Sequence, residues 1–262
     1  MKKRKLILTR PAYDWVLIVL LAWALGGCAA AKAPVAKRWS HTVQPVAEWV
    51  SAEREEEMDF LIPAFNPLTA AGPADQIEAR FRGKDRKGPK TSLANASPVQ
   101  NFATLPALIA TLPPDDAMRD HQPPLETDSN TRLPEELRNV RVRAWIYDIK
   151  YEDDQDWHVI AGTDPAQTPK TYFNTEISGL PSQNAAAFQT LLQVRRSLAD
   201  ILNNDLPGPG HYHSYKDDPI PVIVEGSLFY DIDHAPGVVG PEGRRPKTAW
   251  EIHPITRLEL AQ

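Results

Sequence analysis

Cysteine is almost absent from this sequence, since Cys28 is the only one among 262 residues. A single thiol excludes an intrachain disulfide and every zinc motif built from paired cysteines. The chain also lacks the H-E-x-x-H motif, a glycine-rich phosphate loop and the G-x-S-x-G nucleophile elbow. These absences remove most of the enzyme classes that a short motif can identify.

Negative charge is concentrated in the C-terminal half of the chain. Residues 126–262 contain 21 acidic and 13 basic residues, whereas residues 28–125 contain 12 and 11. An acidic domain repels polyanions, so we do not expect nucleic acid among its partners.

The first 27 residues have the pattern of a secretory signal peptide. Basic residues follow Met1 directly, and an 11-residue apolar run from Trp15 to Leu25 precedes two glycines. This run is too short to cross a bilayer, which takes about 20 residues. The alternative is an uncleaved membrane anchor lengthened by residues 6–8, although Arg10, Pro11 and Asp14 interrupt that extension.

The segment Leu25-Gly26-Gly27-Cys28 resembles the lipobox of bacterial lipoproteins. The resemblance implies cleavage before Cys28, a lipid on its sulfur and acylation of the new amino terminus. Several acyl chains, each methylene contributing about 0.8 kcal/mol, would anchor the protein firmly. Because Ala29 rather than an aspartate follows the cysteine, resemblance to sorted lipoproteins favours the outer membrane. We therefore expect a cell-envelope protein whose first partner is the bilayer, through acylated Cys28.

Residues 28–125 are rich in proline, alanine and charge, with Pro-Pro pairs at 113–114 and 123–124. Prolines at this density resist a continuous core, so we predict a largely irregular tether with two short apolar pieces, 45–61 and 102–112. The run from Arg80 to Lys90 is basic and contains glycine. We interpret it as a solvated linker; contact with anionic lipid or polysaccharide is the alternative.

Residues 126–262 have the periodic hydrophobic patterns of a folded domain. Apolar and polar residues alternate from Val140 to Tyr147, which predicts a strand, and further strands are expected at 157–161, 171–177, 220–232 and 249–260. A helix with an apolar face is predicted from Ala185 to Leu202. The fold is thus mainly β with one helix, and the order β-β-β-α-β-β predicts a small OB-like five-stranded barrel. Another five-stranded barrel or a small α+β sandwich is the alternative.

Three polar clusters stand on or beside these strands: Asp154, Asp156 and His158; Asp231, Asp233 and His234; and Glu251 and His253. Trp250, Ile252 and Leu258 share one parity and are expected to face the core, so Glu251 and His253 point away from it, towards solvent or a groove. Imidazole and carboxylate groups suit zinc or a similar ion, and three protein ligands plus water would make a hydrolytic site. A divalent metal is therefore the cofactor that the residues suggest. The predicted ligands are His158, Asp231, His234, Glu251 and His253.

Two other interpretations of these residues remain. The acidic side chains and histidines could simply cap turns and solvate strand edges. Alternatively, staphylococcal-type nucleases are OB barrels that combine acidic metal ligands with arginines, and Arg195 and Arg196 lie on the predicted helix. The motif of that family does not match this sequence residue by residue, however. If the domain is not a nuclease, Arg195 is expected on the helix surface or paired with a strand carboxylate.

The C-terminal domain also resembles a pattern found in uncharacterised secreted bacterial domains, over residues 140–260. The closing Glu251-Ile252-His253-Pro254 is its most specific element. The resemblance implies an exported β-barrel and brings no activity. We therefore expect a membrane-anchored binding or scaffolding module, for an envelope protein, a glycan or a small ligand, rather than an enzyme. The alternative is a metal-assisted hydrolase, nuclease-like or other.

Overall fold

A computed structural model describes residues 72–95, 98–234 and 236–262. The predicted signal peptide, the lipidation site Cys28 and the first part of the predicted tether lie outside the described residues. Within the described ranges, no helix has the length and apolar character needed to cross a membrane. The structure therefore bears on the second part of the tether and on the predicted barrel.

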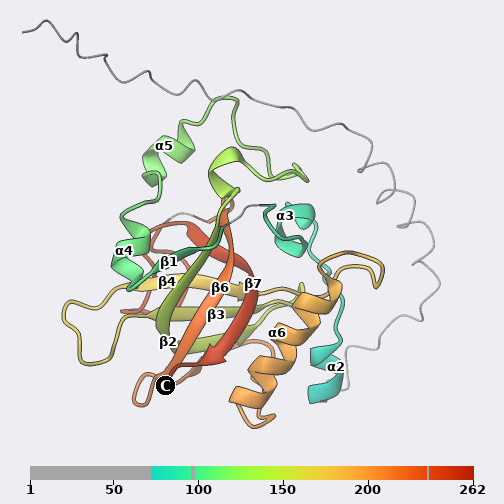
Figure 1. The fold of residues 1–262 in the computed structure, drawn as a ribbon, viewed down its shortest axis with the longest axis vertical. Helices are drawn as coiled ribbons and strands as arrows, with labels where there is room; N and C mark the ends of the chain where they lie inside the picture. The colour runs from blue at the N-terminus through green and yellow to red at the C-terminus, as the bar shows by residue number, and fades with distance from the viewer. Residues whose placement is uncertain (1–71, 96–97, 235) are drawn as a thin grey trace, which may run out of the picture. The chain divides into compact units, whose positions relative to one another are not determined.

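Five strands close into a barrel (Figure 1). The strands are β2 (Asn139–Tyr151), β3 (Trp157–Gly162), β4 (Tyr172–Ile177), β6 (Ile220–Tyr230) and β7 (Trp250–Leu260). Their order is β2-β3-β4-β7-β6, and β6 pairs with β2 to close the circle. β4 and β7 run parallel, whereas the other neighbours run antiparallel. The predicted OB-like barrel is confirmed.

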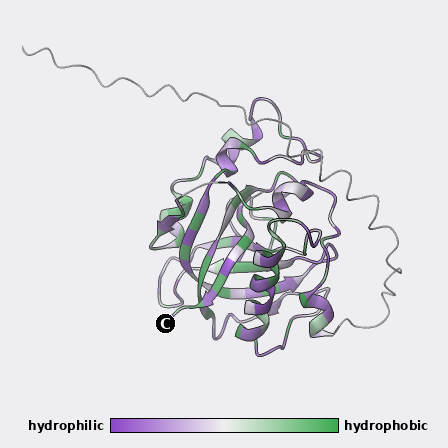
Figure 2. Cartoon of the chain, turned by 45° about the vertical axis from the view of Figure 1, so that its right-hand side comes forward, coloured by the Kyte–Doolittle hydropathy of each residue, from purple (hydrophilic) through white to green (hydrophobic). Residues whose placement is uncertain are grey.

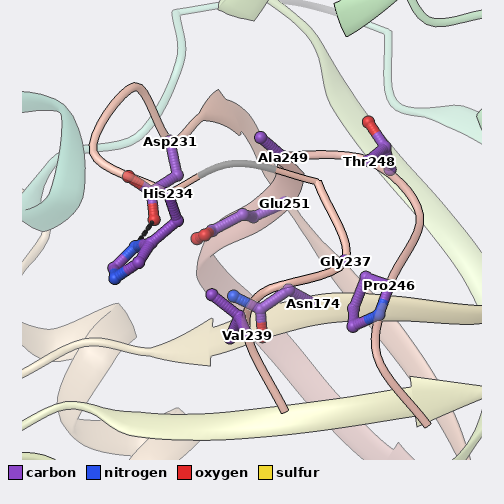
Figure 3. A pocket seen from close by; sticks show the side chains of 9 residues that line it. All are labelled: Asn174, Asp231, His234, Gly237, Val239, Pro246, Thr248, Ala249 and Glu251. Carbon is purple, nitrogen blue, oxygen red and sulfur yellow. Dashed lines mark hydrogen bonds and ion pairs between the residues drawn. The ribbon is translucent and has the colours of Figure 1, made fainter. Parts of the chain in front are cut away.

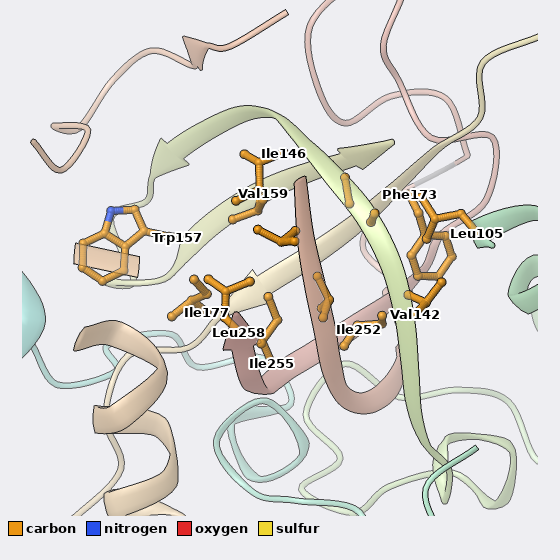
Figure 4. Packing of buried hydrophobic residues seen from close by; sticks show 14 of the residues in the cluster. Leu105, Val142, Ile146, Trp157, Val159, Phe173, Ile177, Ile252, Ile255 and Leu258 are labelled. Atoms are coloured by element: carbon orange, nitrogen blue, oxygen red, sulfur yellow. The ribbon is translucent and has the colours of Figure 1, made fainter. Parts of the chain in front are cut away.

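The alternation of residue types along β2 explains why this strand faces two environments. Val140, Val142 and Ala144 are fully buried inside the barrel, whereas Arg141 and Arg143 between them reach towards solvent. Hydrophobic and hydrophilic residues alternate in this way along the barrel strands (Figure 2). Side chains from all five strands meet in one core, each fully buried aliphatic or aromatic group contributing about 1.5–3 kcal/mol (Figure 4).

Gly226 lets β6 and β7 approach each other closely. The register between the two strands shifts on both sides of this residue. A Cβ atom at position 226 would lie 2.3 Å from the carbonyl oxygen of Pro254, which no side chain could tolerate. The glycine therefore permits the bend that closes the barrel, as glycines in bulged strands commonly do.

Helix α6 (Phe188–Ile201) lies between β4 and β6 in sequence, as predicted. It begins three residues later than expected, and Asn203 and Asn204 end it in the left-handed conformation. Its buried face includes Leu191, Val194 and Leu198, but it also includes Arg195, which has no solvent exposure.

Arg195 is neither on the surface nor paired with a carboxylate, so the prediction for this residue was wrong. Its guanidinium donates hydrogen bonds to the carbonyls of Gln76, Ile77 and Ser178 and lies 4.2 Å from the ring centroid of Trp157. Backbone acceptors are not visible in a residue pattern, which explains the error. Arg195 thus fastens the helix to residues 76–77 and to the segment that follows β4.

The described part of the predicted tether packs on the barrel and contains four short helices and one short strand. It forms α2 (Pro73–Ile77), α3 (Lys87–Thr91), β1 (Gln100–Phe102), α4 (Leu105–Ile109) and α5 (Asp115–Arg119). β1 extends the sheet by pairing in parallel with β2. Leu105, Leu108 and Met118 enter the main core. Residues 72–125, where described, and the barrel thus belong to one compact unit. Elements of three to five residues are too short to show a helical or strand period in the sequence. Two further short elements are η3 (Pro134–Glu136) and β5 (His213–Ser214).

Arg86, within the predicted solvated linker, is buried. Its guanidinium binds both carboxylate oxygens of Glu136, at 2.7 and 2.8 Å, and the two side chains are 2% and 0% exposed. Glu136 also accepts hydrogen bonds from the backbone amides of Leu133 and Tyr230. This pair fixes the α3 segment, which we define as residues 86–92, against the barrel. The solvated-linker interpretation was therefore wrong at this position.

Candidate metal centre

Three side chains from separate parts of the barrel bring their donor atoms together. They are Asp156, directly before β3, Glu176 at the end of β4, and His253 on β7, and one donor atom of each lies within 4.8 Å of the others. His253 Nε2 is 3.3 Å from Asp156 Oδ2, and His253 Nδ1 is 3.1 Å from Glu176 Oε2. We call these three residues the Asp-Glu-His centre.

Strand register explains why these residues meet. In the β3–β4 pair, His158 lies opposite Glu176, and Trp157 lies opposite Ile177. In the β4–β7 pair, Asn174 lies opposite Glu251. Because side chains alternate between faces, the apolar partners fill the core and the polar ones share the outer face of the sheet.

This outer face is covered. Glu251 and His253 do point away from the core, as predicted, but they do not reach solvent: their exposures are 3% and 0%. The ring of Phe229 lies 5.3 Å from that of His253, and that of Tyr212 lies 5.9 Å from that of His158. The backbone amide of Gly179 donates a hydrogen bond to Asp156. The polar side chains are therefore enclosed between the sheet and the segments packed on it.

Several of the enclosed atoms have no hydrogen-bond partner among the described residues. They are both ring nitrogens of His253, Nε2 of His158, Oδ2 of Asp156, Oε2 of Glu251 and Oδ1 of Asn174. The His253 nitrogens are close to carboxylate oxygens but lack hydrogen-bond geometry. Each unpartnered buried polar group costs about 1–3 kcal/mol. A cation among these atoms would remove that cost, so the donor set fits a metal ion.

Burial controls the protonation of the centre. Desolvation raises the pKa of Asp156 well above its usual range, and Asp154 adds to the effect. Desolvation, with Glu176 and Asp231, does the same to the pKa of Glu251. Desolvation lowers the pKa of His253 to about 4, so its imidazole is neutral at pH 7. Neutral imidazole is the form that binds metal ions.

A small pocket adjoins the centre on the side of Glu251 (Figure 3). Glu251, Asp231 and His234 line it together with Asn174, and its volume of about 10 Å³ is room for about one water molecule. The carboxylate of Glu251 points towards the hydrogen-bonded pair of Asp231 and His234. Glu251 also lies 3.5 Å from His253, so it connects the pocket to the centre.

The five predicted ligands lie in one region but do not form one ligand set. His253 belongs to the Asp-Glu-His centre, and Glu251 and His158 are each within 3.7 Å of one of its members. Asp231 and His234 pair with each other beyond Glu251. The prediction omitted Asp156 and Glu176. Asp156 alternates with His158 in the sequence, which was a usable signal, whereas Glu176 joins the set through strand pairing alone.

We compared the chain with protein-family models, with curated proteins and with solved structures, and none of them matches it. The fold and the centre alone define the protein: it is a closed OB-like barrel with a group of candidate metal ligands on its outer face.

Proposed function

We propose that this protein is a lipoprotein of the bacterial envelope, anchored through Cys28, whose barrel is a binding module for a divalent metal ion. The observation that carries the proposal is the convergence of Asp156, Glu176 and His253 in a buried place with unpartnered donor atoms. Glu251 is a further candidate ligand, because its Oε2 lies 3.5 Å from His253 Nδ1.

The donor types favour a transition metal. One imidazole nitrogen with two or three carboxylate oxygens suits zinc, manganese or ferrous iron. The enclosed geometry supports holding the ion rather than turning over a substrate, because a hydrolytic metal keeps one coordination position open to water. Asp156 and His253 are both inaccessible to solvent. A binding module is thus better supported than a metal-assisted hydrolase.

The proposed location depends on the lipobox. The acyl chains on Cys28 would hold the protein in the bilayer of the envelope, with the outer membrane favoured by Ala29. There an envelope protein or a glycan would be the macromolecular partner, and the acidic domain argues against nucleic acid. The Cys28→Ala variant should lose the lipid, leave the membrane fraction and migrate differently on gels. Membrane partitioning and mobility identical to the wild type would contradict the anchor.

Metal content tests the function itself. The detergent-solubilised full chain, loaded with Zn²⁺ or Mn²⁺ and freed of excess, should retain about one ion per chain by elemental analysis. His253→Gln should retain almost none, and His213→Gln, which alters an exposed histidine, should behave as the wild type. A wild-type chain that retains no ion, and whose melting temperature ignores a chelator, would refute metal binding.

A further inference from the structure

Lys90 lies in the α3 segment that covers the Asp-Glu-His centre, and its backbone is tied down on both sides. Ser178 Oγ donates a hydrogen bond to the Lys90 carbonyl. Arg132 donates to the carbonyls of Pro89 and Ser92. With Arg86 bound to Glu136, these contacts hold Lys90 in place over β7. The backbone of Lys90 is therefore fixed relative to the barrel, and its side chain starts from a defined position.

The ammonium group of Lys90 is held close to the centre. Its Nζ lies 5.7 Å from the ring centroid of Phe229, the same ring that packs against His253. Burial lowers the pKa of Lys90, but the carboxylates of Glu176, Glu251 and Asp156 outweigh that effect and raise it above the usual value. Lys90 is thus a permanent positive charge that acts on all three carboxylates.

Neighbouring acidic groups have positive partners of their own. Asp231 pairs with His234, and Glu152 binds Lys150 at 2.8 Å. Arg195 and Asp154 both act on Asp156 but carry opposite charges. Metal binding requires the carboxyl groups of Asp156, Glu176 and Glu251 to ionise, although burial raises their pKa values. Their three negative charges and the positive charge of Lys90 then sum to −2, which a divalent ion balances.

We propose that Lys90 is a fixed counter-charge of the metal centre, which suits the centre to divalent ions and weakens its binding of trivalent ones. The inference rests on the proposed metal-binding function. Coulomb repulsion between Lys90 and the bound ion is proportional to the charge of the ion, whatever the distance and the effective dielectric. Removing Lys90 must therefore help a trivalent ion 1.5 times as much as a divalent one on a logarithmic scale.

The experiment measures the affinities of the full chain for Mn²⁺ and Tb³⁺ by calorimetry, with Tb³⁺ luminescence as a second readout. Lys90→Met keeps the aliphatic stem without the charge, and Lys90→Arg keeps the charge. We expect Lys90→Met to bind Mn²⁺ about 10-fold and Tb³⁺ about 30-fold more tightly than the wild type. We expect Lys90→Arg to stay within about twofold for both ions.

Two kinds of result would overturn the inference, and they differ from a failure of the proposed function. If the wild type binds Mn²⁺ but Lys90→Met gains nothing, or gains equally for both ions, the counter-charge role is wrong and metal binding stands. The same holds if Lys90→Arg gains as much as Lys90→Met. If the wild type binds neither ion, metal binding itself is refuted. Should Lys90→Met fold poorly by circular dichroism, Lys90→Gln replaces it in the same assay.

Discussion

The two faces of strands β3, β4 and β7 bury different kinds of side chain, apolar on the inner face and polar on the outer face. On the inner face, Trp157, Phe173 and Ile252 are fully buried among apolar neighbours. On the outer face, Asn174, Glu251 and His253 are buried to nearly the same degree, yet several of their polar atoms are unpartnered. Burial on the inner face stabilises the fold, whereas burial on the outer face costs stability unless a ligand is bound. The contrast indicates that the outer face serves a function.

The largest expected effect is on the inner face. Phe173→Ala removes a fully buried ring and should lower the free energy of unfolding by about 3–5 kcal/mol, through lost burial and the cavity left behind. Urea denaturation measures it, and the loss should be the same with and without a chelator. Leu260→Ala, at an exposed residue, is the control and should change stability by less than about 0.5 kcal/mol. A loss that depends on the chelator would mean that the two faces are not independent.

An effect of the same size is expected at the buried ion pair that fixes the α3 segment against the barrel. Arg86→Met leaves the Glu136 carboxylate buried without its cation and should cost about 3–5 kcal/mol in the same assay. Arg257→Met, at a half-exposed arginine, should have almost no effect. If Arg86→Met matched this control, the α3 segment would not be fixed by the pair.

Asp156→Asn tests whether a bound metal ion stabilises the outer face. In chelator, replacing a buried carboxyl by an amide of the same shape should be neutral or stabilise the protein by up to about 1 kcal/mol, because Asn keeps the acceptor for Gly179. With a metal at 100 times its Kd, the wild type should gain about 2.7 kcal/mol and the variant nothing. Thermal melts with and without Mn²⁺ measure both values. A variant that gains as much as the wild type would exclude Asp156 as a ligand.

The smallest expected effect is a pH dependence at the Asp231–His234 pair. The hydrogen bond that His234 donates to Asp231 raises the pKa of His234. The stabilisation from the pair is therefore complete below about pH 6.5 and is lost as pH rises through the folded pKa. Burial raises the pKa of Asp231, but the hydrogen bond from His234 outweighs that effect and lowers it. The stabilisation that Asp231 contributes is therefore lost only in acid, below about pH 4. In chelator, His234→Gln should therefore differ from the wild type most near pH 5. Because His234 is half exposed, the difference should stay below about 1 kcal/mol. If the stability difference between His234→Gln and the wild type does not shrink by pH 8.5, the Asp231–His234 pair does not stabilise the protein.

The fold was predictable where side chains alternate over a long strand. β2 carries that period from Val140 to Tyr147, and the helix after β4 carries a helical period. The order of strands and helix along the chain followed from these patterns. The elements between residues 72 and 125 were not predictable, because their stability comes from contacts with the barrel. Arg86 illustrates the point, since its partner Glu136 is 50 residues further along the chain.

The site was predictable in part for a related reason. Glu251 and His253 stand two apart on β7, so the parity of Trp250 and Ile252 placed them on the outer face. Glu176 has no such neighbour in sequence. It meets His253 because β4 pairs in parallel with β7. Paired residues such as Asn174 and Glu251 are 77 residues apart in the sequence, and no local pattern contains such a relation.

Anomalous scattering tests the central claim most directly. Crystals of the protein loaded with Zn²⁺, measured on both sides of the zinc absorption edge, should give one strong difference peak. We expect that peak about 2.0–2.2 Å from a ring nitrogen of His253 and from carboxylate oxygens of Asp156 and Glu176. A map with no peak there, or with peaks only at exposed histidines such as His213, would contradict a metal centre on the outer face of the barrel.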